Sequence, residues 1–417
     1  MQMKFKSILK YSLVGAFTLT LINCSTDSTD SIQEATIDAE NIMFQDSKVI
    51  PGSYVVVYNN TSGKMAPLEK VKSASDYKRQ MSDLKSKFVS EFKSVGLKDT
   101  EITETFGHAL KGFTANLTEE QVNALKKDPK VKSIEPNQTM GISPYKGKPG
   151  GGGTTPPDQQ IPYGTTRVGG GTTASTHTAW VIDTGIDLDH PDLNVDVSRS
   201  VSFLTGGGGA TSPDDQNGHG SHVAGTIGAL NNSIGSVGVA PGTLVVAVRV
   251  LDRRGSGTVS GVIAGVDYVK ANANNGDVAN MSLGGGVSSA LDEAVISAAN
   301  SGVKFALAAG NESDNANNHS PARANAPNIY TISALDGRDA NNPDLWAYFS
   351  NYGNPPVDYC APGYGIYSTW KDGGYNTISG TSMAAPHAAG VLLLGNPSSD
   401  GTVNGDPDGN PDPIIHH

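Results

Sequence analysis

The chain has 417 residues, a formal net charge of -11, 50 glycines and only 6% aromatic residues. That length is enough for two or three domains and at least one sizeable core. The acidic balance argues against a nucleic-acid-binding protein, which needs a basic face to release counterions. The many small residues favour an α/β enzyme over a coiled coil.

The first 24 residues are interpreted as an export signal. Lys4, Lys6 and Lys10 precede the apolar stretch YSLVGAFTLTLIN, which is short for a membrane span, and Cys24 follows it. The ending LINC resembles a bacterial lipobox, in which the cysteine is lipidated after cleavage, and a plain secretory signal is the alternative. On either interpretation the protein leaves the cytoplasm.

Cys360 is the only other cysteine, so we expect no disulfide in the mature chain and a buried thiol at this position. An exported protein without disulfides needs another source of stability, and bound cations commonly provide it. Residues 25–47 are polar and acidic, which predicts a flexible spacer.

Residues 48–140 are predicted to form a small α+β domain. Strands SYVVVY, TEITETFGHAL, KGFTANL and KVKSIEP alternate with helices at 75–92 and TEEQVNALKKD. Thr118 and Gln121 form a capping box at the second helix. The order β-α-β-β-α-β is the split βαβ arrangement, a ferredoxin-like fold. Residues 141–160 are rich in Gly and Pro and are predicted to be a linker that proteases can cut.

From residue 161 the chain alternates apolar strands with helices. The expected strands are 179–183, 244–251, 277–283, 303–309 and 328–335, and the expected helices are 219–229, 258–273 and 289–301. Continuous apolar strands separated by helices predict a mostly parallel sheet covered by helices on both faces. Function in such sheets gathers at the carboxyl ends of the strands.

The two predicted domains differ in charge. Residues 41–140 carry 15 Lys and Arg against 12 Asp and Glu, whereas residues 161–417 carry 10 against 23. A weakly basic small domain beside an acidic large one is compatible with their association.

Four side chains together suggest acyl transfer by serine, which needs an alcohol, an imidazole, a carboxylate and an oxyanion donor. Asp183 ends the strand AWVID, and His219 stands between two glycines at a helix start. Asn311 follows the strand FALAA, and Ser382 opens the helix in ISGTSMAAPHAAG, where the positive end of the helix dipole favours an oxyanion. Pro386 is expected to be tolerated because the first amide hydrogens of a helix lack intrahelical partners.

Each residue also has a simpler interpretation when it is taken alone. Ser382 could be a helix cap, and Asp183 and Asn311 could be turn formers. His219 and His222 stand at helical spacing, but no Glu lies between them as it does in the zinc-protease motif.

The motifs and their order resemble those of the subtilisin-like serine proteases. Asp183, His219 and Ser382 follow in that order, 36 and 163 residues apart, with Asn311 between the last two. The segments VRVLDRRGSG, MSLGGGVSSA and FSNYG are similar to the proteinase K group, and the resemblance covers residues 161–395. Residues 48–140 resemble the inhibitor-type propeptide of the family.

The resemblance implies further site residues. The walls of the pocket for the residue before the scissile bond would be Ser282, Leu283, Gly284, Gly285, Ala308, Ala309 and Gly310. These walls are uncharged, which predicts broad, apolar-leaning specificity. A structural Ca²⁺ site is implied at Asp358, with the backbone carbonyls of Pro327 and Ile329.

The resemblance also implies how the protein matures. We expect protein or peptide substrates, a monomer, and an N-terminal domain that inhibits the enzyme until the chain cuts itself near residues 136–160. A lipid on Cys24 would anchor the precursor at the membrane or cell surface, and cleavage would release the mature enzyme. Residues 396–417 depart from the family: they are expected to form a solvated acidic tail, although Asp406, Asp408, Asn410 and Asp412 alternate like half of a calcium loop.

Three alternatives are weighed against this interpretation. A catalytically inactive binding lipoprotein would lack a catalytic group, and none is missing. A lipase or esterase would carry G-x-S-x-G with the histidine last in the chain, which does not fit Gly-Thr-Ser-Met-Ala at residues 380–384. A zinc peptidase would be inhibited by a zinc chelator and not by a serine-directed phosphonate.

Overall fold

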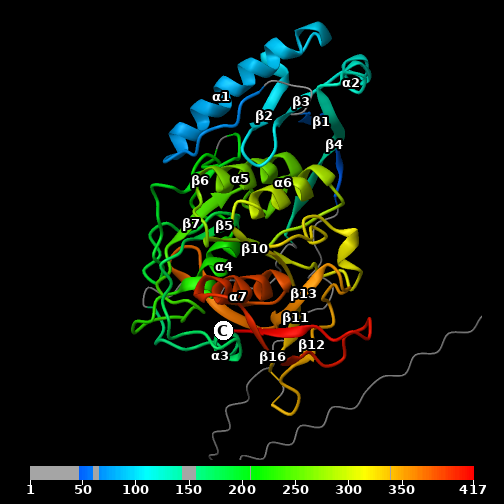
Figure 1. Cartoon of the computed structure of the whole chain (residues 1–417). Helices are drawn as coiled ribbons and strands as arrows, with labels where there is room; N and C mark the ends of the chain where they lie inside the picture. Colours follow the sequence, from blue (N-terminus) through cyan, green and yellow to red (C-terminus); the bar gives the residue numbers. More distant parts are fainter. Residues whose placement is uncertain (1–46, 60–64, 143–155, 207, 339) are drawn as a thin grey trace, which may run out of the picture. The chain divides into compact units, whose positions relative to one another are not determined.

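The protein is built on a small antiparallel sheet and a large, mostly parallel one (Figure 1). The computed structural model describes residues 47–59, 65–142, 156–206, 208–338 and 340–417. The expected signal, with Cys24, and residues 25–46 of the expected spacer lie outside the described residues. All described residues belong to one compact unit, Ala39–His417.

The N-terminal domain (residues 47–142) has the predicted ferredoxin-like order. Its elements are β1 (Val49–Tyr58), α1 (Ala74–Glu91), the 3-10 turns η2 (Lys93–Val95) and η3 (Asp99–Glu101), β2 (Ile102–Phe106), β3 (Gly112–Asn116), α2 (Glu119–Leu125) and β4 (Val131–Gly141). The strands pair antiparallel in the order β2-β3-β1-β4.

Local sequence explains both helices of this domain. Ser73 caps α1 by accepting from the backbone N–H of Asp76, and Tyr77, Met81, Leu84 and Phe88 follow at helical spacing and are buried. The predicted capping box at α2 is confirmed, because the side chains of Thr118 and Gln121 each accept from the other's backbone N–H.

The large sheet follows the order β16-β17-β13-β11-β10-β9-β5-β7-β6, with β12 paired to β11. Its central strands are β5 (Ala179–Asp183), β6 (Val201–Ser202), β7 (Val245–Arg249), β9 (Val278–Met281), β10 (Lys304–Ala308), β11 (Ile329–Asp336) and β13 (Val357–Pro362). All neighbouring pairs among them are parallel, as predicted.

Helices cover both faces of the sheet. They are α4 (His219–Gly228), α5 (Val259–Asn272), α6 (Ser289–Ala299) and α7 (Thr381–Leu394). Trp180 and Ile182 of β5 share a core with α5 and α6, whereas Ala179 and Val181 share a core with α4 and α7. This alternation follows from the two-residue period of a strand.

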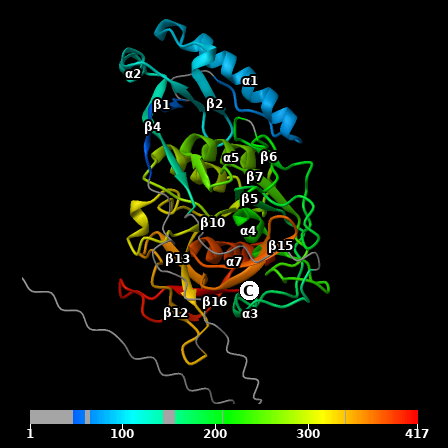
Figure 2. The same ribbon diagram turned by 180° about the vertical axis from the view of Figure 1, so that it is seen from behind.

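The N-terminal domain packs against α5 and α6, as both views show (Figures 1 and 2). Its strand β4 continues into the large domain by pairing with β8 (Ser256–Thr258). The two helices are therefore covered by the large sheet on one side and by the small sheet on the other.

Like β6, β8 and β13, the remaining elements were not foreseen from the sequence. They are α3 (Tyr163–Arg167), η4 (Ala316–Asn318), β12 (Leu345–Trp346), β14 (Ile366–Trp370), β15 (Gly374–Ile378), β16 (Ser398–Thr402) and β17 (Pro413–His416). The expected linker is also shorter at both ends. Residues 141 and 142 are bound to the large domain, and residues 157–160 pair with residues 233–236.

The expectation of a solvated C-terminal tail is wrong for its second half. β17 pairs parallel with β13, Ile414 and Ile415 are fully buried, and Asp412 has 0% exposure. Arg167 holds the hairpin in place, with two hydrogen bonds to Asp344 and one to the backbone of Asp400. The chain thus closes its fold with a hairpin that extends the large sheet.

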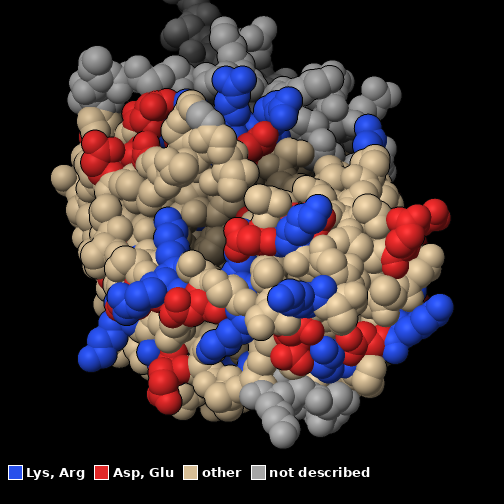
Figure 3. Space-filling view, turned by 90° about the horizontal axis from the view of Figure 1, so that it is seen from above, with Lys and Arg blue, Asp and Glu red and all other residues tan. Residues whose placement is uncertain are grey.

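On the face shown in Figure 3, Lys and Arg side chains are interspersed with Asp and Glu side chains, and they do not form one continuous basic patch. In the described ranges, no helix combines the length and the apolar character that crossing a membrane requires.

Candidate active site

Asp183 and His219 form a tight pair at the carboxyl end of β5. The Nδ1–H of His219 points at both carboxylate oxygens of Asp183, at 2.8 and 3.0 Å. Asp183 has 0% exposure, and His219 has 6%. A buried carboxylate in this position fixes the imidazole tautomer and leaves Nε2 available as a base.

The turn before His219 is held by two residues that the sequence analysis missed. One carboxylate oxygen of Asp215 accepts from the backbone N–H groups of Asn217 and Gly218, and the other accepts from Ser221. Thr184 accepts from Gly220 N–H and donates to Asp215. An acidic residue four positions before a glycine-flanked histidine could have signalled this turn.

Ser382 is the second residue of α7, and this helix packs against α4, whose first residue is His219. The hydroxyl of Ser382 donates to the backbone carbonyl of Ser282, at 3.2 Å. Within the described ranges no hydrogen bond joins this hydroxyl to His219. Catalytic hydrogen bonds of this kind are often long or poorly aligned until the Michaelis complex forms.

The side chain of Asn311 is oriented by Thr381. Its Oδ1 accepts from the backbone N–H of Thr381 (2.8 Å) and from the Thr381 hydroxyl (2.9 Å). Because a backbone N–H can only donate, the amide oxygen must face Thr381, and Nδ2 is directed elsewhere. Thr381 is a third residue that the sequence analysis missed, although it directly precedes Ser382.

The other predicted pocket residues lie at the ends of neighbouring strands. Residues 282–285 follow β9. Ala308 ends β10, the neighbouring strand in the sheet, and residues 309 and 310 follow it. All seven are buried. Gly310 has φ of +111°, a conformation that favours glycine.

The end of the N-terminal domain lies between two edges of the large domain. Met140 and Gly141 pair with β8, and Ile142 N–H donates to Gly255 (3.0 Å). On the opposite side, Gly141 and Gly284 exchange two backbone hydrogen bonds, of 3.0 and 3.1 Å. An extended peptide therefore fills the groove between β8 and residues 283–285.

Asp358 lies in β13, next to the strand that begins with Ile329. Its Oδ2 accepts from Thr331 N–H (2.9 Å), and burial raises the pKa of its carboxyl to about 6. Asp358 is half-buried and has no basic partner among the described residues, which makes its carboxylate a suitable hard ligand for a cation. Pro327, the other expected carbonyl donor, is exposed.

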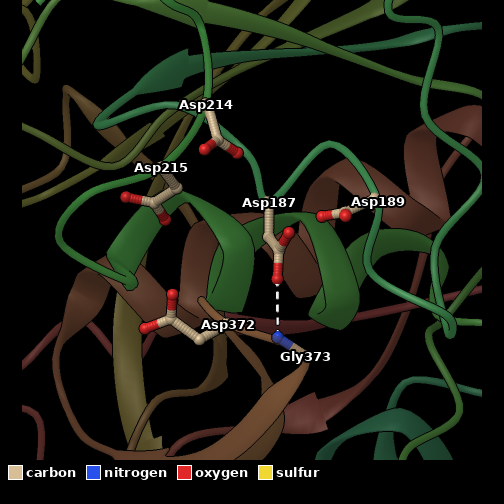
Figure 4. Close-up of a pocket in the computed structure, with 6 residues that line it drawn as sticks. All are labelled: Asp187, Asp189, Asp214, Asp215, Asp372 and Gly373. Atoms are coloured by element: carbon tan, nitrogen blue, oxygen red, sulfur yellow. Dashed lines mark hydrogen bonds between the residues drawn. The ribbon is translucent and has the colours of Figure 1, made fainter. Parts of the chain in front are cut away.

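A second hollow, of about 400 Å³, is lined by Gly373 and five aspartates: Asp187, Asp189, Asp214, Asp215 and Asp372 (Figure 4). The carboxylate of Asp187 accepts from Gly373 N–H (2.7 Å), and burial raises its pKa to about 6. Over the described ranges, no three acidic, His or Cys side chains are placed to hold a metal ion.

Both domains of the chain are similar to known proteins. Residues 179–398 match the Subtilase family, and residues 53–143 match Peptidase inhibitor I9. Alkaline serine exoprotease A of Vibrio alginolyticus is 45% identical over 311 residues, 72% of this chain and 54% of that protein. Extracellular serine proteinase of Thermus sp. (strain Rt41A) is 37% identical over 379 residues, 90% of this chain and 88% of that protein.

A crystal structure of a cold-adapted subtilisin-like serine proteinase is 48% identical, with a TM-score of 0.47 over 53% of this chain and 75% of that one. The chain spans about half of the Vibrio relative and most of the Thermus relative. It belongs to the subtilase family of serine peptidases, and its N-terminal domain is an I9-type propeptide.

Proposed function

We propose that the protein is a serine endopeptidase in which Ser382 is the nucleophile, His219 the general base and Asp183 the carboxylate that orients the base. The observation that carries the proposal is the pair of close contacts between His219 Nδ1 and the buried Asp183. A catalytically inactive binding protein finds no support, since none of these groups is missing.

The chemistry uses groups with defined partners. His219 Nε2 takes the proton of the Ser382 hydroxyl as its oxygen attacks the substrate carbonyl, and later returns it to the leaving amine. The oxyanion is stabilised by Asn311 Nδ2 and by the backbone N–H of Ser382, which lies in the first turn of α7. Thr381 supports this role because it binds the amide oxygen of Asn311 and so keeps that oxygen turned away from the oxyanion.

Substrates would bind as extended strands with broad, apolar-leaning preference. The groove that holds residues 140–142 offers backbone hydrogen bonds on both edges, and these bonds do not depend on the side chains of the bound peptide. The walls at residues 282–285 and 308–310 carry no charge. Cleavage after Lys or Arg as fast as after apolar residues in a peptide library would contradict this specificity.

The propeptide would act as an inhibitor within the same molecule, because its last residues occupy the substrate groove. Ile142 is bound in the groove and Asp158 is paired to Ile234, so we infer that the maturation cut falls between them. The mature enzyme would be monomeric and extracellular, the latter in keeping with the name of the Thermus relative. A lipid on Cys24 would stay with the propeptide, so recovery of mature enzyme still attached to Cys24 would contradict release.

A structural Ca²⁺ would be held by Asp358 together with the carbonyls of Pro327 and Ile329. The raised pKa of the half-buried Asp358 carboxyl supports this, because a cation would offset its charge. Chelation should therefore lower the melting temperature of the native chain and leave that of Asp358→Asn unchanged. An equal shift in both would exclude a site at Asp358.

The central test is Ser382→Ala in the full-length chain, followed by intact-mass analysis. We expect an uncut, inactive precursor, because the hydroxyl that performs both maturation and substrate hydrolysis is gone. A normally processed Ser382→Ala chain would mean that another protease matures it. Retained peptidase activity would refute the mechanism.

A further inference from the structure

The helix that carries Ser382 contains a proline that removes one of its backbone hydrogen bonds. Pro386 is the sixth residue of α7, so the expectation that it lies among the first, unpaired amides is wrong. In an α-helix the carbonyl of residue 382 accepts from the N–H of residue 386, and proline has none. The helix therefore leaves the carbonyl of Ser382 without its regular partner.

The hydroxyl of Ser282 supplies the missing donor. It donates to the carbonyl of Ser382 at 2.7 Å, and in turn it accepts from the side-chain amide of Asn280 at 2.8 Å. Ser282 has 0% exposure and Asn280 has 1%, so no solvent competes for these bonds.

Ser282 also contacts the hydroxyl of the nucleophile. Its backbone carbonyl accepts from Ser382 Oγ at 3.2 Å, so the carbonyl and the hydroxyl of Ser382 are both hydrogen-bonded to Ser282. Asn280 is a rigid anchor because it lies in β9, paired to Val181 of β5 and to Ala306 of β10. The nucleophile is thus connected to the centre of the large sheet through two side chains.

Resting on the proposed function of Ser382, we propose that Ser282 is a positioning residue. Its hydroxyl, oriented by Asn280, holds the first turn of α7 in place, because Pro386 removes the helix hydrogen bond that would otherwise do so. Removal of the hydroxyl would leave a buried carbonyl unsatisfied and free the turn to shift. A misplacement of about 1 Å at a reacting atom can cost on the order of a hundredfold in rate.

The test is Ser282→Ala in the full-length chain, with peptide hydrolysis measured per mole of processed enzyme. We expect kcat to fall roughly 10- to 100-fold and KM to change less than about threefold, because the substrate edge at Gly284 uses backbone groups. Ser175→Ala is the matched control. Its hydroxyl donates to the carbonyl of Leu393 at the other end of α7 (2.8 Å), and its loss should leave kcat unchanged.

The same substitution made in a Pro386→Ala variant separates a positioning effect of Ser282 from an effect on general stability. Pro386→Ala restores an N–H to the helix, which can satisfy the Ser382 carbonyl without Ser282. In that background Ser282→Ala should lower kcat less than about threefold. An equal fold-loss with and without Pro386→Ala would overturn the proposal, because it would show that the hydroxyl acts independently of the helix break.

If Ser282→Ala does not accumulate as folded protein, Asn280→Ser replaces it. We expect a three- to tenfold loss of kcat, on the order of one weakened buried hydrogen bond, that Pro386→Ala again removes. Failure of Pro386→Ala to remove it would also overturn the proposal. Absence of peptidase activity in both the native chain and Ser175→Ala would overturn the proposed function, and the positioning role with it.

Discussion

At the scale of single residues, the site depends on side chains that orient other side chains. Asp183 orients His219, and Thr381 orients Asn311. The hydroxyl of Thr381 also accepts from Gly310 N–H (3.1 Å), so it joins the end of β10 to the start of α7. The oxyanion donor and the nucleophile are therefore positioned together.

We expect Thr381→Val to lower kcat about tenfold with little change in KM. Loss of a whole oxyanion donor costs on the order of 100- to 1,000-fold, and here Asn311 remains but is less firmly oriented. Steady-state kinetics of the processed enzyme would measure this. Thr243→Val is a matched control, since Thr243 is equally buried and its hydroxyl donates to the carbonyl of Ala240 (2.7 Å). Unchanged kcat in Thr381→Val would contradict the role of Thr381.

The sequence predicted Asp183, His219, Ser382 and Asn311 because each stands at a strand end or helix start beside residues that permit a turn. It did not predict Asp215, although the contacts of Asp215 lie mostly within the turn before His219, and it did not predict Thr381, whose contribution is a contact with another segment. Such contacts become visible only after the fold brings the segments together. The Ser282 hydroxyl is a similar case, because the resemblance placed this residue in a pocket wall and did not reveal its contact with α7.

At the scale of elements, β6 and β13 were not predicted, but the other central strands and the helices α1, α4, α5, α6 and α7 were predicted within a few residues. These elements are fully apolar or amphipathic, and that pattern is readable in one sequence. The C-terminal hairpin was not predicted, because β16 is polar and exposed and β17 is only four residues long. Its burial depends on the free edge of β13, which the local sequence does not reveal.

The hairpin brings a buried carboxylate into the large domain. The carboxylate of Asp412 accepts from the hydroxyl of Ser333. Burial raises the pKa of Asp412 to about 6 from an ordinary value of 3.8. The folded state therefore disfavours the charged form, and charging Asp412 opposes folding.

We expect this carboxyl to make the fold less stable as the pH rises from about 4 to about 6. An acid whose pKa is higher in the folded state keeps its proton there after the unfolded chain has lost it, at a cost of up to about 3 kcal/mol. Asp412→Asn should reduce this loss, measured as the change in melting temperature between pH 4 and pH 7 in a Ser382→Ala background that prevents self-digestion. Asp83→Asn, on the exposed face of α1, should not. Equal pH dependence in native and Asp412→Asn chains would contradict the assignment.

At the scale of the whole molecule, one buried carboxylate of the large domain anchors the propeptide. Asp267 of α5 accepts from the consecutive backbone N–H groups of Gly107, His108 and Ala109, and from the hydroxyl of Tyr77 (2.9 Å). All four donors belong to the propeptide, and Asp267 has 0% exposure. Among the described residues, one ion pair crosses this interface: it joins Lys132 to Glu293 (2.6 Å), whose side chains are 53% and 39% exposed.

We therefore expect Asp267→Asn to lower the affinity of the catalytic domain for the cleaved propeptide by at least about thirtyfold. Removing one partner of a buried, hydrogen-bonded charge typically costs 2–5 kcal/mol, whereas an exposed ion pair contributes about 0–1 kcal/mol. The processed Asp267→Asn complex should lose its propeptide in size-exclusion chromatography and gain peptidase activity without the lag of the native complex. Glu293→Gln, the matched change at the exposed pair, should behave like the native chain. If the two variants released the propeptide equally fast, burial of Asp267 would not be what distinguishes the two contacts, and the shape of the apolar interface over α5 and α6 would have to account for the association.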